Sequence, residues 1–283
     1  MSTPLETKSK TQRDMMFLTG SRRRTLITVF GVVFVSAFLL LGFIRQQYVV
    51  PILMYHSVNP TAVPENRLAV SVNTFERQIR FLKTHHYNVM PLEAIASLIK
   101  ARSKIPSKTV AITLDDGYKD NYTYAFPILK KYNLPATIFI IVNEVGRPQS
   151  DRLTWDEIKI MQDTGIINFG SHTLTHKYLE EIKTKGELIK EIFDSKRILE
   201  EKLGRQVNVF SYPSGSFTAS MRQIVIDAGY KLAVATNPGK RFPSDDIFAL
   251  KRLRISSNAD NLFVFWIETS GYYNFIREYK RKK

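Results

Sequence analysis

One stretch decides the fold: Thr113-Leu114-Asp115-Asp116-Gly117. It closes the alternating apolar run Thr109–Leu114, which predicts a buried strand, so two adjacent carboxylates come where a strand ends and a loop begins. In a barrel of parallel strands, such a position faces the active-site mouth. Because adjacent carboxylates repel each other, a fold usually keeps them there with water, with a metal ion, or with one acting as base and the other as ligand. The alternative is structural, since an Asp before Gly117 could cap the next helix.

A second motif, Ser171-His172-Thr173-Leu174-Thr175-His176, follows the predicted strand Ile166–Gly170. His172 and His176 are four residues apart, so in a helix both imidazoles would project from one face. Two imidazoles and one carboxylate make three protein ligands and leave one position open for water, as in catalytic zinc sites. The chain has no cysteine, so any metal must be held by His and carboxylates. In a barrel this motif and the Asp pair would lie on the same rim.

Strands and helices alternate from Tyr48 onward, which predicts a parallel sheet, and so many units without a linker indicate a closed or nearly closed barrel. The predicted strands are Val49–Tyr55, Tyr87–Met90, Thr109–Leu114, Ala136–Val142, Ile166–Gly170, Val207–Tyr212, Lys231–Ala235 and Leu250–Ile255. The predicted helices are Asn73–His86, Leu92–Ala101, Tyr122–Tyr132, one from Trp155, Gly186–Leu203, Met221–Ala228 and Asn261–Ile267.

An uncharged segment precedes this region. Residues 25–44 contain no charged side chain and would reach about 30 Å as a helix, the thickness of a bilayer's hydrocarbon core. The basic residues before it predict a cytoplasmic N-terminus and an extracellular catalytic domain at the cell membrane. A cleaved signal peptide is the alternative, but no small-residue cleavage site follows. We therefore predict a disordered basic tail over 1–24, a transmembrane signal anchor over 25–44, a catalytic domain over 45–275 and a solvated basic tail over 276–283.

The composition limits the choice of partners. With 283 residues, of which 44% are hydrophobic, the chain can bury one large core. The net charge of +15 is spread along the chain, without a basic run interleaved with aromatics as in a nucleic-acid module. A basic body suits an anionic envelope surface, and no nucleic-acid partner is expected.

Three motifs, TLDDG, SHTLTH and FSYPSG at 210–215, occur in the order found in the polysaccharide deacetylases, carbohydrate esterase family 4, which the chain resembles over about residues 49–265. The flanking phrases LTWDE at 153–157 and ATNPG at 235–239 also fit. The resemblance implies an irregular TIM-like (β/α) barrel, here preceded by one transmembrane helix. It implies a metal-dependent hydrolase that removes N-acetyl groups from an extracellular or cell-wall amino-sugar polysaccharide, of the peptidoglycan or poly-N-acetylglucosamine type. The alternatives are an O-acetyl polysaccharide esterase and a pseudoenzyme that binds a wall polymer.

The resemblance also implies roles for single residues. Asp115 corresponds to the general base, whereas Asp116, His172 and His176 correspond to the ligands of one divalent metal ion. Zinc is expected, and this ligand set is compatible with other divalent ions. The backbone N–H of Ser214 corresponds to the donor that stabilises the oxyanion.

Two departures from the family pattern bear on catalysis. Ser211 stands where many members have an arginine that orients the base, so Arg252 is the candidate for that task. Ser214 stands where an aromatic residue is usual. Many members use a late histidine as the acid, but no histidine follows His176. His56 resembles the histidine of the YH motif in the poly-N-acetylglucosamine deacetylase subgroup, which serves as the acid; the alternative is a satisfied strand-end histidine.

Three aromatic residues are candidates for sugar contacts: Tyr118, Trp155 and Tyr212. Trp155 could stack on a pyranose ring, but its helical spacing to Ile158 is equally typical of a core residue. Asp120 could line the cleft or cap the helix after it. The identity of the glycan and the oligomeric state stay open.

Overall fold

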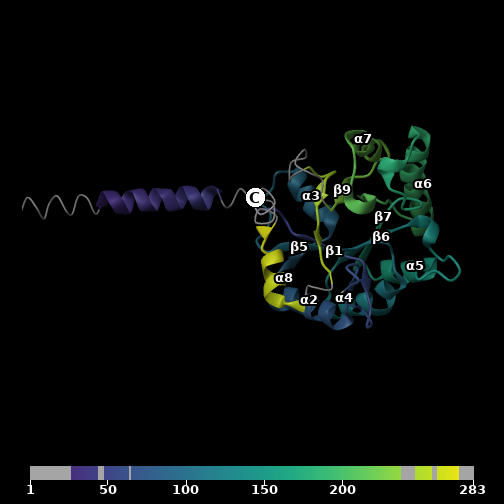
Figure 1. Cartoon of the computed structure of the whole chain (residues 1–283), viewed down its shortest axis with the longest axis horizontal. Coiled ribbons are helices and arrows are strands. Elements are labelled where there is room, and N and C mark those ends of the chain that lie inside the picture. Colours follow the sequence, from purple (N-terminus) through teal and green to yellow (C-terminus); the bar gives the residue numbers. More distant parts are fainter. Residues whose placement is uncertain (1–26, 44–47, 64, 237–245, 257–259, 274–283) are drawn as a thin grey trace, which may run out of the picture. The chain divides into compact units, whose positions relative to one another are not determined.

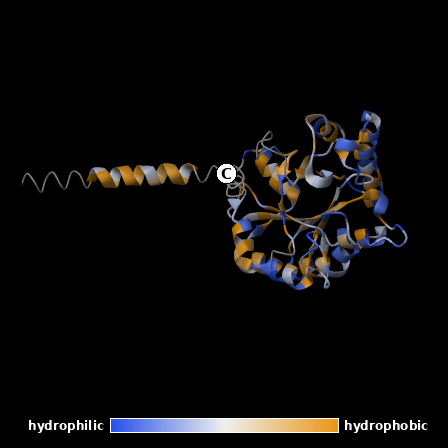
Figure 2. Ribbon diagram, viewed as in Figure 1, coloured by the Kyte–Doolittle hydropathy of each residue, from blue (hydrophilic) through white to orange (hydrophobic). Residues whose placement is uncertain are grey.

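The computed structural model describes residues 27–43, 48–63, 65–236, 246–256 and 260–273, in two compact units divided after Tyr48. The predicted tails over 1–24 and 276–283 lie outside the described residues. Residues 27–43 form a helix, apolar along most of its length (Figure 2), and every residue in it is exposed. Residues 25, 26 and 44 of the predicted anchor are not described. No helix in the described part of the chain combines the length and the hydropathy that a membrane crossing requires.

The second unit is a nearly closed barrel of parallel strands with helices around it (Figure 1), as the alternating pattern predicts. The strands pair in the order β10-β9-β8-β7-β6-β5-β1-β11, and β4 adds to β5 outside this path. A separate pair, β2 and β3, follows β1. The bounds are β1 Ile52–Tyr55, β2 Ser57–Val58, β3 Ala69–Val70, β4 Asn88–Val89, β5 Thr109–Leu114, β6 Ala136–Ile140, β7 Ile167–Ser171, β8 Val209–Ser211, β9 Leu232–Ala235, β10 Leu250–Lys251 and β11 Leu253–Arg254.

The helices lie where the apolar periodicity predicts them. Helix α2 buries Phe75, Ile79 and Leu82 on one face and begins at the N-cap Ser71. A capping box of Thr154 and Glu157 starts helix α5. The bounds are α2 Val72–Thr84, α3 Leu92–Lys100, α4 Phe126–Tyr132, α5 Trp155–Asp163, α6 Lys185–Leu203, α7 Ala219–Asp227 and α8 Leu262–Glu268.

One predicted strand is wrong in a way that matters for the site. The run Leu250–Ile255 forms two short strands, because the first and last strands of a closing sheet must be joined and this segment pairs with both. Leu250 pairs with Val234 of β9, whereas Leu253 pairs with Leu53 of β1. Arg252 therefore lies where the chain changes its pairing partner.

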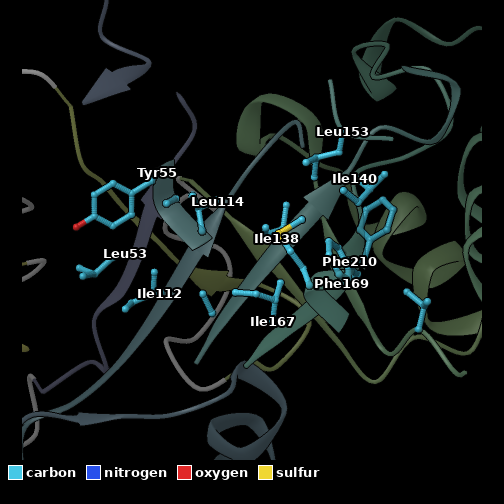
Figure 3. Close-up of a cluster of buried hydrophobic side chains, with 14 of the residues drawn as sticks. Leu53, Tyr55, Ile112, Leu114, Ile138, Ile140, Leu153, Ile167, Phe169 and Phe210 are labelled. Carbon is cyan, nitrogen blue, oxygen red and sulfur yellow. The ribbon is translucent and has the colours of Figure 1, made fainter. Parts of the chain in front are cut away.

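The two faces of each strand point to different surroundings. On β5, Ile112 and Leu114 belong to the apolar layer between strands and helices, which Figure 3 shows together with residues of β1, β6, β7 and β8. Thr113 and Asp115 alternate with them and so point to the interior of the barrel. The barrel interior, and not the apolar layer, is where the polar residues of the site can meet.

Candidate active site

Asp115 is held from inside the barrel by Arg252. The two guanidinium nitrogens Nη1 and Nη2 donate to Oδ1 and Oδ2 of Asp115, each at 2.6 Å. Nη2 also donates to Ser211 Oγ at 2.9 Å. Arg252 is 1% exposed, so this is a buried, bidentate ion pair. The small side chain of Ser211 leaves room for the guanidinium of Arg252, which comes from the segment between β10 and β11. The hydroxyl of Ser211 accepts a hydrogen bond from this guanidinium.

The ion pair sets the charge of Asp115. Burial alone would raise the pKa of the Asp115 carboxyl, but the guanidinium of Arg252, helped by His172, holds that pKa well below its usual range. Asp115 is therefore ionised at neutral pH. Its Oδ2 atom lies 3.7 Å from Nε2 of His172, so the carboxylate borders the histidine pair.

Asp116, His172 and His176 form a cluster of three ligand atoms. The Nε2 atoms of His172 and His176 are 3.1 Å apart. Oδ1 of Asp116 lies 3.5 Å from Nε2 of His172 and 3.6 Å from Nε2 of His176. Ligands about 2.0–2.2 Å from a tetrahedral zinc ion are about 3.3–3.6 Å from one another. The two distances to Asp116 fall in this range and the distance between the imidazoles lies just below it, so the cluster is close to the spacing of a metal site.

Three further observations fit a metal ion. Oδ1 of Asp116 is buried and has no hydrogen-bond partner among the described residues. Nδ1 of His172 lies 2.9 Å from the carbonyl oxygen of Ser211, a contact that holds the proton on Nδ1 and leaves Nε2 free to ligate. Burial lowers the pKa of His176, and His172 lowers it further, whereas Asp116 opposes the shift. The lowered pKa favours the neutral form of His176, which is the form that ligates a metal.

The histidines do not meet in the way that their spacing suggests. Residues 172–178 are not helical. Thr173 (φ 68°) and His176 (φ 61°) instead adopt left-handed conformations, which fold the loop back so that the two rings converge. The prediction that they share a helical face is wrong, whereas the expected convergence of His172, His176 and Asp116 is found.

Glu191, on helix α6, shapes this loop and was missed in the sequence. Its Oε2 atom accepts the backbone N–H of Leu174 at 3.0 Å and that of Thr175 at 2.9 Å, and its Oε1 atom accepts the hydroxyl of Thr175. The carboxylate is buried. The available signal was an acidic residue on the face that α6 otherwise buries through Leu188, Ile192, Ser195 and Leu199.

Backbone conformation places Asp116 in the cluster. Asp116 (φ 71°) and Gly117 (φ 62°) are both left-handed, and a Cβ at Gly117 would lie 2.8 Å from Cδ1 of Ile140. A side chain there would be strained by the left-handed backbone and would displace Ile140, so glycine suits the position. Neither Asp caps the following helical turn, whose N-cap residue is Asp120, and Asp120 makes no capping bond itself. Instead it accepts a hydrogen bond from Ser57 at 2.5 Å.

His56 lies directly after β1 and is 8% exposed. Its Nδ1 atom is buried and has no hydrogen-bond partner in the described part of the chain. Asn121 donates to the backbone carbonyl of His56 at 2.8 Å and fixes the chain there. Burial lowers the pKa of His56, against the attraction of Asp115 and Asp116. The side chain is thus close enough to both carboxylates to sense their charge.

The other candidates lie in different surroundings. Ser214 is exposed and left-handed (φ 58°), in the turn after β8. Tyr212 is a core residue, because its side chain is buried and its hydroxyl donates to the carbonyl of Phe248, so it offers no surface for a sugar. Trp155 is partly buried against the core, with the Lys202 ammonium over its ring. Tyr118 is half-buried, and the guanidinium of Arg152 stacks on its ring at 3.9 Å.

Known proteins resemble the chain across this unit. The family profile described as polysaccharide deacetylase matches residues 102–233. The Bacillus subtilis (strain 168) protein YxkH, a candidate polysaccharide deacetylase, is 37% identical over 208 residues, 73% of this chain and 71% of that protein. The poly-β-1,6-N-acetyl-D-glucosamine N-deacetylase of Staphylococcus aureus (strain N315) is 30% identical over 209 residues, 70% of this chain and 72% of that one.

A solved structure agrees with these relatives. The Streptococcus pyogenes deacetylase PplD, in complex with acetate, matches with a TM-score of 0.68 and 31% identity over 76% of this chain and 97% of that one. The match therefore takes in nearly all of that chain. By identity and coverage of this extent, the chain belongs to the polysaccharide deacetylase family and is a hydrolase of that family.

Proposed function

We propose that this polysaccharide deacetylase is a metal-dependent hydrolase that removes N-acetyl groups from an amino-sugar polymer outside the cell. One observation carries the proposal: Arg252 holds the ionised carboxylate of Asp115 beside Asp116, which faces two imidazoles and whose buried Oδ1 has no hydrogen-bond partner among the described residues. A base next to a three-ligand metal site is the arrangement that hydrolytic cleavage of an amide needs.

Asp116, His172 and His176 would hold the ion, and zinc suits this set of nitrogen and oxygen donors. When bound, such an ion polarises the acetyl carbonyl and acidifies water. Asp115 takes the proton of the water whose oxygen attacks the acetyl carbon, and Arg252 keeps the carboxylate oriented.

The bond between the acetyl carbon and the sugar nitrogen then breaks. His56 gives a proton to the leaving amine, and its buried Nδ1, unpaired among the described residues, supports this role. The backbone N–H of Ser214 donates to the oxyanion from its exposed turn. Acetate and a free amino sugar are the products.

The names of the relatives support an N-acetylated glycan. The Staphylococcus aureus protein is a poly-β-1,6-N-acetyl-D-glucosamine N-deacetylase, and the Streptococcus pyogenes deacetylase was solved with acetate, the acid that both N- and O-deacetylation release. Peptidoglycan and poly-N-acetylglucosamine are both candidates. An O-acetyl polysaccharide esterase is the alternative, because ester and amide hydrolysis share the same base and metal ligands.

The location is proposed from the N-terminal segment. Residues 25–44 carry no charge and follow Arg22, Arg23 and Arg24, and the described part, 27–43, is a helix with all its residues exposed. We therefore propose a single-pass anchor with the N-terminus in the cytoplasm and the barrel outside.

Acetate release tests the activity. Residues 46–283 contain the whole second unit, whose counterpart is nearly all of the solved Streptococcus chain. This fragment, stripped with chelator and reloaded with zinc or cobalt, should release acetate from N-acetylglucosamine oligomers only in the loaded state. Release from O-acetylated xylan alone would favour the esterase. Binding of the oligomers without release by the loaded protein would favour the pseudoenzyme.

The topology can be tested separately, because the chain has no native cysteine. In intact cells, a membrane-impermeant maleimide should label the full chain carrying Ser103→Cys, an exposed position of the barrel unit. It should not label the full chain carrying Ser9→Cys until the cells are lysed. Labelling of Ser9→Cys in intact cells would overturn the proposed orientation.

A further inference from the structure

We propose that a hollow next to His176, with Tyr178 as its aromatic wall, binds a further sugar ring of the polymer. The inference rests on the proposed function, and it adds a second point of contact for the chain that is being deacetylated. The hollow has a volume of about 510 Å³ and is lined by residues 177, 178, 181–184 and 187. Pockets for small ligands generally measure about 300–1,000 Å³, so a sugar ring can fit there.

The hollow lies on the same rim of the barrel as the metal ligands. It is built from the segment between the carboxyl end of β7 and the start of helix α6, which in a (β/α) barrel lies at the active-site face. Tyr178 comes two residues after His176. Glu180, in the same segment, accepts the hydroxyl of Ser216 at 2.6 Å, which ties the segment to the turn that carries Ser214.

The segment is fixed so that Tyr178 stays exposed. Leu179 is buried and Ile182 packs against the core, so these two residues after Tyr178 anchor the chain. Tyr178 itself is 58% exposed. Single exposed apolar residues are common and need no function. An exposed aromatic ring bordering a hollow, two residues from a catalytic metal ligand, is a different case, because a pyranose ring can lie against its face.

The polar side chains of the hollow suit a neutral sugar. Two ammonium groups, Lys177 and Lys183, are balanced by two carboxylates, Glu181 and Glu187, and Oε2 of Glu187 accepts the hydroxyl of Thr184 at 3.0 Å. Such a mixture offers both donors and acceptors to sugar hydroxyls. Its balanced charge gives no advantage to a polyanion such as nucleic acid or teichoic acid.

The test is a comparison of chain lengths. In metal-loaded protein, Tyr178→Ala should lower kcat/KM for an N-acetylglucosamine pentamer by roughly threefold to tenfold, the usual size of an aromatic contact. Turnover of the dimer should not change. Tyr178→Phe keeps the ring and should restore the pentamer rate. The matched control is Phe263→Ala on α8, which removes a 64% exposed ring elsewhere and should leave both rates unchanged.

A binding measurement separates this inference from the proposed activity. Asp115→Asn removes the base, so pentamer affinity can be measured by calorimetry without turnover. Adding Tyr178→Ala in this background should weaken pentamer binding by the same factor and leave dimer binding as it was. Equal loss for dimer and pentamer, no loss for either, or no binding of the pentamer at all would each overturn the subsite. A wild-type protein that binds the pentamer through Tyr178 but releases no acetate would leave the subsite standing and refute the activity.

Discussion

Asp115 and Asp116 are neighbours in the chain, yet the surroundings of their side chains are opposite. Asp115 faces a cation that the protein itself supplies, and both of its oxygens are paired with Arg252. Asp116 faces two imidazoles and keeps one buried oxygen without a partner in the described part of the chain. The difference shows how a fold can keep two adjacent carboxylates: the charge of Asp115 is neutralised by a cation of the protein, and Asp116, under the proposed function, is left to bind a metal ion.

The largest expected effect comes from removing Asp116, the carboxylate proposed to bind the metal ion. Asp116→Ala should abolish stoichiometric metal binding and lower acetate release at least about 10³-fold, because a catalytic metal is worth several kcal/mol of barrier. Metal content by mass spectrometry or elemental analysis gives the first readout. Metal retained at one ion per chain would sink the ligand assignment.

Arg252→Met tests the ion pair that holds Asp115. It leaves the buried charge of Asp115 without its cation, so the free energy of unfolding should fall by about 3–5 kcal/mol, measured by urea denaturation at pH 7. The control is Arg197→Met, which removes an exposed ion pair with Glu201 and should leave the unfolding midpoint unchanged. An equal, small effect in both variants would mean that the Asp115 ion pair adds nothing to stability.

The pH dependence sharpens the same point for the metal-free protein. The folded-state pKa of Asp115 is held below its usual value, so its stabilising contribution is present above the unfolded-state pKa, about 4, and is lost as the pH falls. The stability difference between wild type and Arg252→Met should therefore shrink when denaturation is repeated between pH 5 and pH 3. A difference that stays constant over that range would contradict the charge-based explanation.

His56 lies close enough to Asp115 and Asp116 to interact with their charges. Replacing it tests whether it is the general acid. His56→Ala should reduce turnover about 10²-fold or more, the usual size of general acid catalysis, with metal content unchanged. His86→Ala, which alters an exposed histidine, is the matched control. Near-native turnover of His56→Ala would move the acid to another group.

The smallest of these effects comes from Glu191, which holds the loop that carries His172 and His176. Glu191→Gln keeps one oxygen for the two backbone N–H donors but loses the charge and an acceptor for Thr175, so the loop that carries His172 and His176 should be held less firmly. Metal affinity, measured by competition with a chelator, should fall about 10–100-fold. Glu201→Gln, on the exposed face of the same helix, should leave it unaltered. Unaltered affinity in Glu191→Gln would make this carboxylate purely structural.

Much of the fold, and the convergence of Asp116, His172 and His176, could be predicted from the sequence. Alternating apolar runs gave the strands, and carboxylates and histidines at strand ends pointed to a common rim. The contact of Arg252 with Asp115 was also anticipated, from the absence of arginine at Ser211. What could not be predicted depends on backbone conformation and distant packing. The left-handed residues Thr173 and His176 fold the histidine loop, and spacing alone suggested a helix instead.

Burial decided the remaining differences. Tyr212 lies in a motif and is a candidate for sugar contact by sequence, but directly after β8 its side chain is buried in the core. Glu191 looked like one of many charges on a long helix, and only its burial beneath the loop reveals its contacts. The split of Leu250–Ile255 into two strands follows from closure of the sheet, which no local pattern contains.

That split also divides the site by the order in which the chain is made. The proposed metal ligands lie between residues 116 and 176, whereas Arg252 comes from the segment that joins the two ends of the sheet. A nascent or C-terminally truncated chain can contain the whole ligand set and still lack the cation that holds Asp115. Under the proposed function, completion of the barrel and alignment of Asp115 as the base are therefore the same structural event.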